Sequence, residues 1–209
     1  MRVNGSLVRD PEAPVRIEVD RIRINGEIIR RPRQVYLMLN KPRGIVTTAS
    51  DEKGRQTVYA LLPHDQWLAT VGRLDKASEG LLLLTNDSEW AAHITDPATH
   101  LDKTYHVQIA ALADERLLRT LVAGVLEGGE LLEAKRATLL RMGGKNCWLE
   151  IVLDEGKNRQ IRRMFSAFGI EVLRLVRVAI GPLQLGNLPK GATRELAREE
   201  VRALSRFKA

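Results

Sequence analysis

The sequence predicts an α+β protein with a mixed, mostly antiparallel sheet and flanking helices. Strand-like stretches outnumber helical ones, and they follow one another without the regular helical crossovers that parallel strands require. The chain has 209 residues, of which 44% are hydrophobic and 28% charged. This ordinary globular composition and length allow one catalytic-sized domain with a small appendage.

The appendage is expected at residues 1–32, followed by a domain at residues 33–209. Short alternating stretches at residues 2–7 and 20–24 are accompanied by the turn signals Asn4-Gly5 and Asn25-Gly26. An Asn-Gly pair beside such stretches favours a tight hairpin. Arg31-Pro32-Arg33 then has the composition of a linker.

Hydrophobic periodicity predicts the elements of the larger domain. Strands are expected at residues 35–40, 68–71, 81–85, 104–110, 134–141, 147–154, 172–176 and 178–185. Helices are expected at residues 57–62, 90–95, 114–123, 158–168 and 193–207. Tyr105, Val107 and Ile109 alternate on one strand face, whereas Ile161 and Phe165 belong to a pattern with helical spacing.

The charge of the chain favours a polyanionic partner. The formal net charge is +7, and 24 of the 33 basic residues are arginines, whose rigid forks bind phosphate through two hydrogen bonds. Aromatic residues make up only 4%, which disfavours an extended stacking platform for single strands. A protein that recognises the shape and phosphates of folded RNA fits this composition better.

Several classes of protein are disfavoured. The single cysteine, Cys147, excludes an intramolecular disulfide and a multi-thiolate zinc site. No apolar run approaches the roughly 20 residues of a membrane helix, and the first residues lack a signal-peptide core. We therefore expect a soluble, cytoplasmic monomer with no membrane or disulfide partner. The sequence contains no phosphate-binding loop, no dinucleotide fingerprint and no histidine spacing typical of a metal site.

Gly72-Arg73-Leu74-Asp75 is the first candidate for chemistry. It lies on a predicted tight turn between two buried strands, which would hold the carboxylate of Asp75 rigidly at the edge of the sheet. Such a carboxylate can act as a nucleophile or as a general base. The alternative is that Asp75 only closes its own turn.

The basic segment from Lys157 to Arg177 is the second candidate. On its predicted helix, Arg159, Arg162 and Arg163 would be surface neighbours, and Arg162 would lie at the edge of the buried face, within reach of a carboxylate. The alternative is a solvated basic stripe. Tyr105 is the third candidate, because its ring can pack while its hydroxyl reaches a site; otherwise it is a plain core tyrosine.

Four motifs, taken in order, resemble those of bacterial ribosomal RNA pseudouridine synthases of the RsuA/RluB/RluE/RluF group. They are Lys41-Pro42-x-Gly44, Gly72-Arg73-Leu74-Asp75, Lys103-Thr104-Tyr105 and Glu155-Gly156-Lys157-Asn158-Arg159-Gln160-Ile161-Arg162-Arg163-Met164. The resemblance extends from Val35 to about Leu204. Each motif alone is weak, but four in the right order make the resemblance specific.

This resemblance implies the pseudouridine synthase fold and the isomerisation of uridine to pseudouridine in ribosomal RNA, with 23S rRNA favoured over 16S rRNA. The target base would be flipped out of its stack. The partner would be ribosomal RNA or a pre-ribosomal particle, and neither a cofactor nor a metal would be needed.

The resemblance also implies roles for individual residues. Asp75 would be the essential nucleophile or base, and Arg162 would pair with it and keep it ionised. Tyr105 would stack on the target base, Arg73 would help to fill the gap that the base leaves, and Leu175 would line the pocket. Contacts to the RNA backbone are expected from Lys41, Lys157, Arg159 and Arg163.

Residues 1–32 resemble the C-terminal half of an S4 RNA-binding module, through Arg2-Val3-Asn4-Gly5, Asp20-Arg21-Ile22 and Asn25-Gly26. The helical half that precedes these motifs in such a module does not occur before Arg2. We therefore expect either a chain that begins late or a reduced module.

Two other functions stay open at the level of sequence. One is a non-catalytic ribosome-assembly or RNA-binding protein that has kept the fold. The other is a metal-dependent phosphodiesterase that uses Asp75 and Glu79, which the lack of further clustered acids disfavours. Analysis of the RNA product separates the three, since it would be an isomer, unchanged RNA or a cleaved strand.

Overall fold

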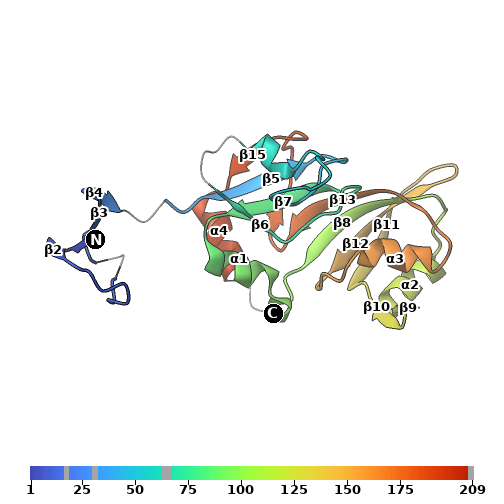
Figure 1. The fold of residues 1–209 in the computed structure, drawn as a ribbon. Helices are drawn as coiled ribbons and strands as arrows, with labels where there is room; N and C mark the ends of the chain where they lie inside the picture. Colours follow the sequence, from blue (N-terminus) through green and yellow to red (C-terminus); the bar gives the residue numbers. More distant parts are fainter. Residues whose placement is uncertain (17–18, 30–32, 63–66, 207–209) are drawn as a thin grey trace. The chain divides into compact units, whose positions relative to one another are not determined.

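The chain divides into two compact units, Met1–Gln34 and Val35–Ala209. The structure is a computed structural model that describes residues 1–16, 19–29, 33–62 and 67–206 (Figure 1). Within these residues, no helix combines the length and the apolar character needed to cross a membrane.

The first unit is a small sheet of four short strands. Its order is β2-β1-β3-β4, with β1 at Arg2–Val3, β2 at Ser6–Leu7, β3 at Ile22–Ile24 and β4 at Glu27–Ile29. Asn4 and Gly5, and likewise Asn25 and Gly26, all have positive φ, as a tight turn between right-twisted strands requires. Both hairpins predicted from the Asn-Gly pairs are therefore confirmed. Residues 31 and 32 of the predicted linker lie outside the described residues.

The second unit is built on a nine-stranded sheet, in which seven strands follow the order β11-β12-β8-β13-β7-β5-β15. The central strands are β5 (Tyr36–Lys41), β7 (Glu79–Thr85), β8 (Lys103–Ile109), β12 (Cys147–Leu153) and β13 (Val172–Ile180). The others are β6 (Ala69–Val71), β11 (Arg136–Met142), β14 (Leu183–Gln184) and β15 (Thr193–Glu195). Among the named strands of the described chain, the β13–β7 pair is parallel and the rest are antiparallel, which confirms the predicted mixed sheet.

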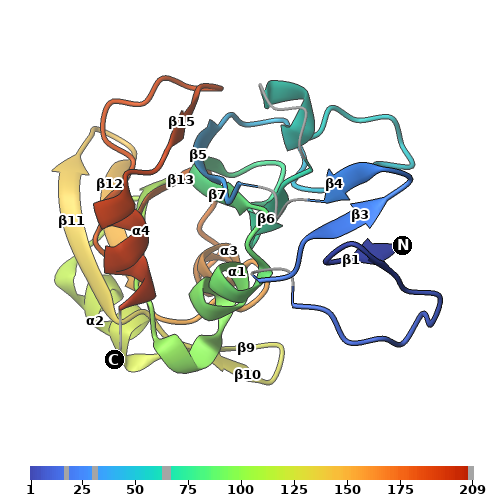
Figure 2. The same ribbon diagram turned by 90° about the vertical axis from the view of Figure 1, so that its left-hand side faces the viewer.

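Short helices and one hairpin complete this unit. They are η1 (Val58–Leu61), α1 (Ser88–Thr95), η2 (Pro97–Thr99), α2 (Glu115–Ala123), α3 (Gln160–Ser166), α4 (Arg198–Ser205) and the hairpin of β9 (Val125–Glu127) and β10 (Glu130–Leu132). Asp114 caps α2 as predicted, because its Oδ1 accepts a hydrogen bond from the amide of Leu117 at 2.8 Å. Figures 1 and 2 show α1 and α3 against one face of the sheet, near opposite ends of it.

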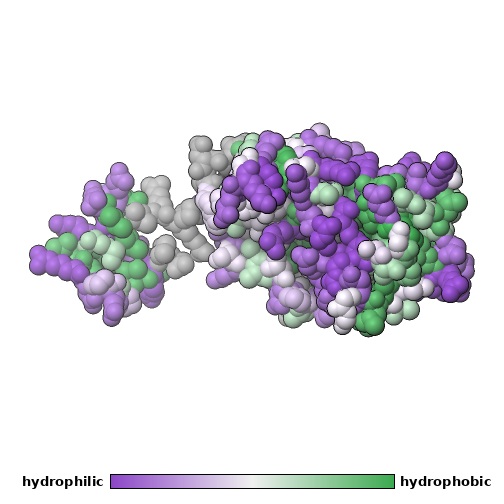
Figure 3. Space-filling view, turned by 45° about the vertical axis from the view of Figure 1, so that its right-hand side comes forward, coloured by the Kyte–Doolittle hydropathy of each residue, from purple (hydrophilic) through white to green (hydrophobic). Residues whose placement is uncertain are grey.

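Strand β7 joins the two layers of the core. All seven of its residues are buried, and successive side chains of a strand point to opposite faces. Leu81 and Leu83 pack with α1, whereas Leu82 and Leu84 pack into a cluster on the other face. A third cluster places Phe165 of α3 on β8 and β12. On the face of this unit that Figure 3 shows, hydrophilic side chains form a broad band beside a hydrophobic area.

Three predictions of local structure were wrong. Residues 193–207 do not form one helix, because Thr193–Glu195 pairs with β5 before α4 begins at Arg198; Phe207 lies outside the described residues. The two strands predicted at 172–176 and 178–185 are the long strand β13, with an irregularity between Arg177 and Ala179, followed by β14. Helix α3 begins at Gln160 rather than at Asn158, because Arg159 adopts a left-handed conformation with φ of 49°.

Candidate active site

A cavity of about 540 Å³ opens on the face of the sheet between α1 and α3. Strands β8 and β13 contribute Lys103, Tyr105, Leu175 and Arg177 to its lining. The β6–β7 connection, residues at the end of α1, and the loop before α3 supply the walls. The wall residues used below are Arg73, Asp75, Glu155, Lys157, Arg159 and Gln160.

Asp75 lies on the β6–β7 connection, and the backbone of that turn is held at several points. The Thr47 hydroxyl donates a hydrogen bond to the carbonyl of Leu74 at 2.8 Å, and the Gly44 amide donates to that of Lys76 at 2.7 Å. The amide of Ser78 donates to the carbonyl of Asp75 at 3.0 Å, which closes the turn. The carboxylate itself is 34% exposed and faces the cavity. The predicted turn at Asp75 is therefore confirmed, and its backbone is anchored by these hydrogen bonds.

Lys41 does not lie where RNA could contact it. Its side chain is fully buried, and its Nζ donates to the carbonyls of Pro42, Asp75 and Ser78 at 3.1, 3.1 and 2.9 Å. Burial lowers the pKa of Lys41 to about 8, although the negative charges of Asp75 and Glu79 oppose this effect. The predicted backbone contact is thus wrong, because Lys41 supports the turn that carries Asp75.

The arginine that pairs with Asp75 is Arg159, not Arg162. Nη1 of Arg159 lies 3.8 Å from Oδ2 of Asp75, and both side chains are open to solvent, at 53% and 34% exposure. Because Arg159 precedes α3 in a left-handed conformation, it does not share a helix face with Arg162 and Arg163. The prediction that these three arginines are neighbours on one helix surface is therefore wrong.

Arg162 acts on the same turn through the backbone. Its Nη2 donates to the carbonyl of Ala77 and its Nη1 to that of Val172, both at 3.1 Å. Burial and the positive charges of Arg159 and Arg43 lower the pKa of Arg162, while the charge of Asp75 acts in the opposite direction. The guanidinium therefore joins the Asp75 turn to β13 and lies within the electrostatic field of Asp75 without contacting it.

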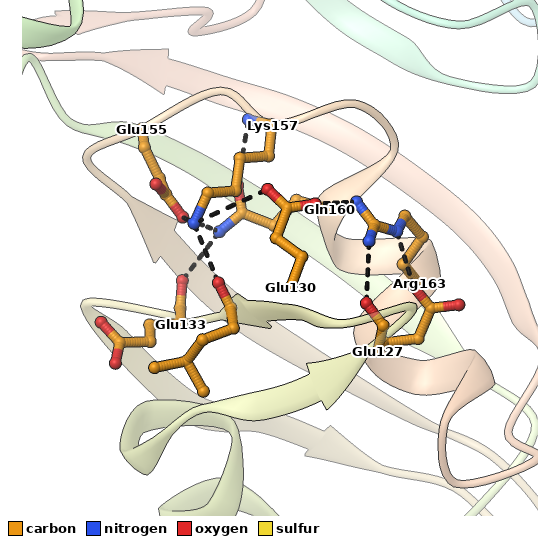
Figure 4. Close-up of polar contacts among 8 residues, drawn as sticks. Glu127, Glu130, Glu133, Glu155, Lys157, Gln160 and Arg163 are labelled. Carbon is orange, nitrogen blue, oxygen red and sulfur yellow. Dashed lines mark hydrogen bonds and ion pairs between the residues drawn. The ribbon is translucent and has the colours of Figure 1, made fainter.

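Arg163 does not line the cavity, and its side chain reaches the β9–β10 hairpin (Figure 4). It forms ion pairs of 2.7 Å with Glu127 and Glu130, and these hydrogen bonds raise its pKa. Two carboxylates already neutralise Arg163, so these contacts give no support to its predicted contact with the RNA backbone, which stays a prediction. Lys157 does line the cavity, but its Nζ donates to the carbonyl of Leu131 at 2.9 Å and pairs with Glu155 at 3.0 Å.

Gln160 is a site residue that the sequence analysis did not single out. Only 3% of it is exposed, and its Nε2 donates to the carbonyl of Glu133 at 2.9 Å and to Glu155 at 2.7 Å (Figure 4). Its Oε1 accepts a hydrogen bond from the amide of Lys157 at 3.3 Å. Gln160 therefore fixes the loop that carries Arg159. The sequence did contain a signal for this role, because Gln160 stands at the start of an amphipathic helix, next to a buried isoleucine.

The remaining predicted residues are brought together around Asp75. Tyr105 is half-buried, Leu175 is buried and Arg73 is exposed, and all three line the cavity.

Glu79, the second acid of the phosphodiesterase alternative, does not line the cavity and forms ion pairs with Arg174 at 3.1 Å and Lys190 at 2.5 Å. Burial raises the pKa of Glu79, but these two cations bring that pKa below its ordinary value. Within the described ranges, no group of three or more His, Cys, Asp and Glu residues could hold a metal ion.

Comparisons with known proteins agree with this fold. The family model described as RNA pseudouridylate synthase matches residues 35–167. Ribosomal large subunit pseudouridine synthase B of Bacillus subtilis is 39% identical over 208 residues, covering 98% of this chain and 84% of that protein. An RNA pseudouridine synthase of Aquifex aeolicus is 38% identical over 212 residues, covering 100% and 84%.

Among solved structures, the crystal structure of a pseudouridylate synthase matches with a TM-score of 0.74 at 33% identity. It covers 97% of this chain and 87% of the other. The family model matches more than half of the chain, and the relatives are more than 30% identical to it. The chain is an enzyme that belongs to the RNA pseudouridylate synthase family.

Proposed function

We propose that this enzyme isomerises a uridine of large-subunit ribosomal RNA to pseudouridine, with Asp75 as its essential carboxylate. The observation that carries the proposal is the position of Asp75, part-exposed in the cavity on a turn whose backbone is anchored. The other carboxylate of the lining, Glu155, is already bonded to Gln160 and Lys157. Asp75, with an ion pair of 3.8 Å, is freer to meet a substrate.

In the proposed reaction, the bond between N1 of the base and C1′ of the ribose breaks, and C5 of the base then bonds to C1′. C5 loses a proton and N1 gains one, so the product is an isomer and no cofactor is consumed. The carboxylate of Asp75 either attacks the sugar or base as a nucleophile or removes a ribose proton as a base. Both roles require it to be ionised and held in place.

The uridine would enter the cavity by base flipping, because a stacked nucleotide cannot bring its glycosidic bond to a carboxylate on a rigid turn. Tyr105 on the cavity floor would stack on the base, Leu175 would contact it, and the exposed Arg73 would help to fill the vacated stack. Arg159, at 53% exposure, is suited to contact phosphate as well as Asp75. These contacts would offset the few kcal/mol that unstacking costs.

The choice of large-subunit over small-subunit RNA is supported by the name of the Bacillus subtilis relative. Full-length protein incubated with 23S and 16S rRNA transcripts, followed by pseudouridine mapping, tests this choice. Pseudouridine in the 16S transcript alone would overturn it. The proposal also includes a role for the first unit, Met1–Gln34, in binding the RNA, as its resemblance to part of an S4 module implies.

Asp75→Asn tests the role of the carboxylate. The amide has nearly the same shape, so we expect the variant to fold and to bind RNA, yet to make no pseudouridine. Glu171→Gln is the matched control, because it neutralises an exposed acid that does not line the cavity. Measurable turnover by pure Asp75→Asn protein would refute the assignment. RNA binding without product by the wild type would favour the non-catalytic alternative.

A further inference from the structure

We propose that Lys103 and Arg177 form a cationic contact for the base, which binds a carbonyl oxygen of the uracil ring and stabilises the negative charge that builds on it. This inference rests on the proposed function, because it assigns a role within the same cavity. Neither side chain was singled out by the sequence for such a role, although Lys103 lies in one of the four motifs.

The sheet places the two cations around Tyr105. Arg177 of β13 pairs in register with Tyr105 of β8, and Ile180 of the same strand pairs with Lys103. Lys103 and Tyr105 are two residues apart on one strand and share a face. All four residues line the cavity. A base stacked on Tyr105 would therefore have two cations nearby, Lys103 along the same strand and Arg177 on the neighbouring strand.

Arg177 is buried without a full set of partners. Only 6% of the residue is exposed, and its Nε donates to the carbonyl of Leu81 at 2.7 Å. Its Nη2 is buried and has no hydrogen-bond partner among the described residues. A buried N–H group without an acceptor is costly, and native structures contain few of them. An acceptor supplied by a substrate would remove that cost in the complex.

Lys103 also lacks a direct partner within the part of the chain that the structure describes. Two carboxylates, Asp154 and Asp102, act on its charge without forming a hydrogen bond or ion pair with it; Asp102 is bonded to Lys135 at 2.8 Å, and Asp154 lies 3.5 Å from Nδ1 of His100. Burial and the charge of Arg177 both lower the pKa of Lys103, and the two carboxylates oppose this change. Two neighbouring cations without a dedicated counter-ion form a site for a negative or partly negative group.

The chemistry of the reaction supplies such a group. When the N1–C1′ bond breaks, its electron pair stays with the base and spreads over the ring to O2 and O4. The sugar carbon is left electron-poor until C5 uses that electron pair to form the new bond. Fixed cations aimed at those oxygens would be stronger partners in the transition state than in the ground state, which is the condition for accelerating the reaction.

An RNA phosphate is the other source of anionic oxygen. The burial of Arg177 on the sheet favours the base, since the exposed cations Arg73 and Arg159 are better placed for a backbone that stays outside the cavity. The two sources differ in measurable ways. A base contact that strengthens in the transition state changes the rate at saturating RNA, whereas a phosphate contact changes the affinity and its dependence on salt.

Lys103→Met is the test, in the full-length protein with a 23S rRNA transcript as probe. We expect the single-turnover rate at saturating RNA to fall by about 10- to 100-fold, the loss expected for a hydrogen bond to a charged group. The dissociation constant and its salt dependence should match the wild type. Lys103→Arg, which keeps the charge, should recover most of the rate. Lys145→Met, on an exposed hairpin, is the matched control.

Three results would overturn the inference. One is an unchanged saturating rate with weaker binding and a salt slope reduced by about one, which would assign Lys103 to a phosphate. Another is no change in either quantity. The third is full activity of Arg177→Met, which removes the other cation and also tests the inference if Lys103→Met does not fold. The absence of product from the wild type with both rRNA transcripts would instead refute the proposed function itself.

Discussion

Gly80 lies where the backbones of β7 and β13 approach each other closely. It lies opposite Arg177 in the parallel pair of β7 and β13, and its φ is +101°. A Cβ atom added there would overlap the carbonyl oxygen of Arg177 and come within 2.9 Å of its amide nitrogen and 3.0 Å of its carbonyl carbon. These are backbone atoms of a central strand, so they cannot move aside as a flexible side chain could.

Gly80→Ala should therefore destabilise the enzyme strongly. Backbone strain costs about 1–3 kcal/mol and overpacking about another 1–3 kcal/mol, so we expect the free energy of unfolding to fall by about 4 kcal/mol. For a domain of this size, that corresponds to a melting temperature lower by roughly 8–16 °C. Equilibrium urea denaturation and calorimetry measure both quantities.

Gly156→Ala is the control for this prediction, since no atom lies within 4 Å of its added Cβ and its φ is not in the left-handed region. It should leave the stability nearly unchanged. A loss of less than about 1 kcal/mol for Gly80→Ala would show that β7 and β13 separate easily. The overlap of the added Cβ with the backbone of Arg177 would then be relieved at little cost.

Three further predictions follow from the contacts around Asp75. Burial lowers the pKa of Lys41 from 10.5 to about 8, so between these pH values the unfolded chain binds more protons than the folded one. As the pH rises from 8 to 10.5, the unfolding free energy of the wild type should therefore increase by about 2–3 kcal/mol relative to that of Lys41→Met. Urea titrations measure this difference, and a difference that stays constant with pH would contradict the prediction. Arg159→Ala should reduce the slope of log K against log salt for RNA by about one, whereas Arg163→Ala should leave it unchanged; the reverse order would exchange their assignments. Arg162→Lys should lose one of the two hydrogen bonds that Arg162 donates to carbonyl groups. We expect the unfolding free energy to fall by about 1–2 kcal/mol and turnover at saturating RNA to slow. Wild-type values for both quantities would show that the link to the Asp75 turn is dispensable.

Local patterns of the sequence were sufficient for most strands and for the turn that carries Asp75. Alternating apolar residues predicted β8 and the run of leucines predicted β7, because side-chain periodicity depends only on neighbours in the chain. The Asn-Gly pairs predicted both hairpins of the first unit, since only a few residue types accept their positive φ. Asp75 was identified because its turn lies between two such strands.

The partners of the charged residues were decided by tertiary structure. Helical periodicity placed Arg159, Arg162 and Arg163 on one surface, but a single left-handed residue before α3 separated their directions. Arg163 then met two glutamates of the β9–β10 hairpin more than 30 positions away, and Lys41 met carbonyls of the Asp75 turn. Such contacts depend on which backbone groups the fold leaves within reach.

The composition, the order of the motifs and the alternation of apolar residues thus predicted the fold class, the family resemblance and the turn that carries Asp75. Only the tertiary structure decided which cations face Asp75, which support its turn and which lie on the floor beneath it. The physical reason is the range of the interactions involved. Strand and turn preferences are set within a few residues of chain, whereas burial and ion pairing are set by segments such as β7 and β13, which lie far apart in sequence and meet only in the folded sheet.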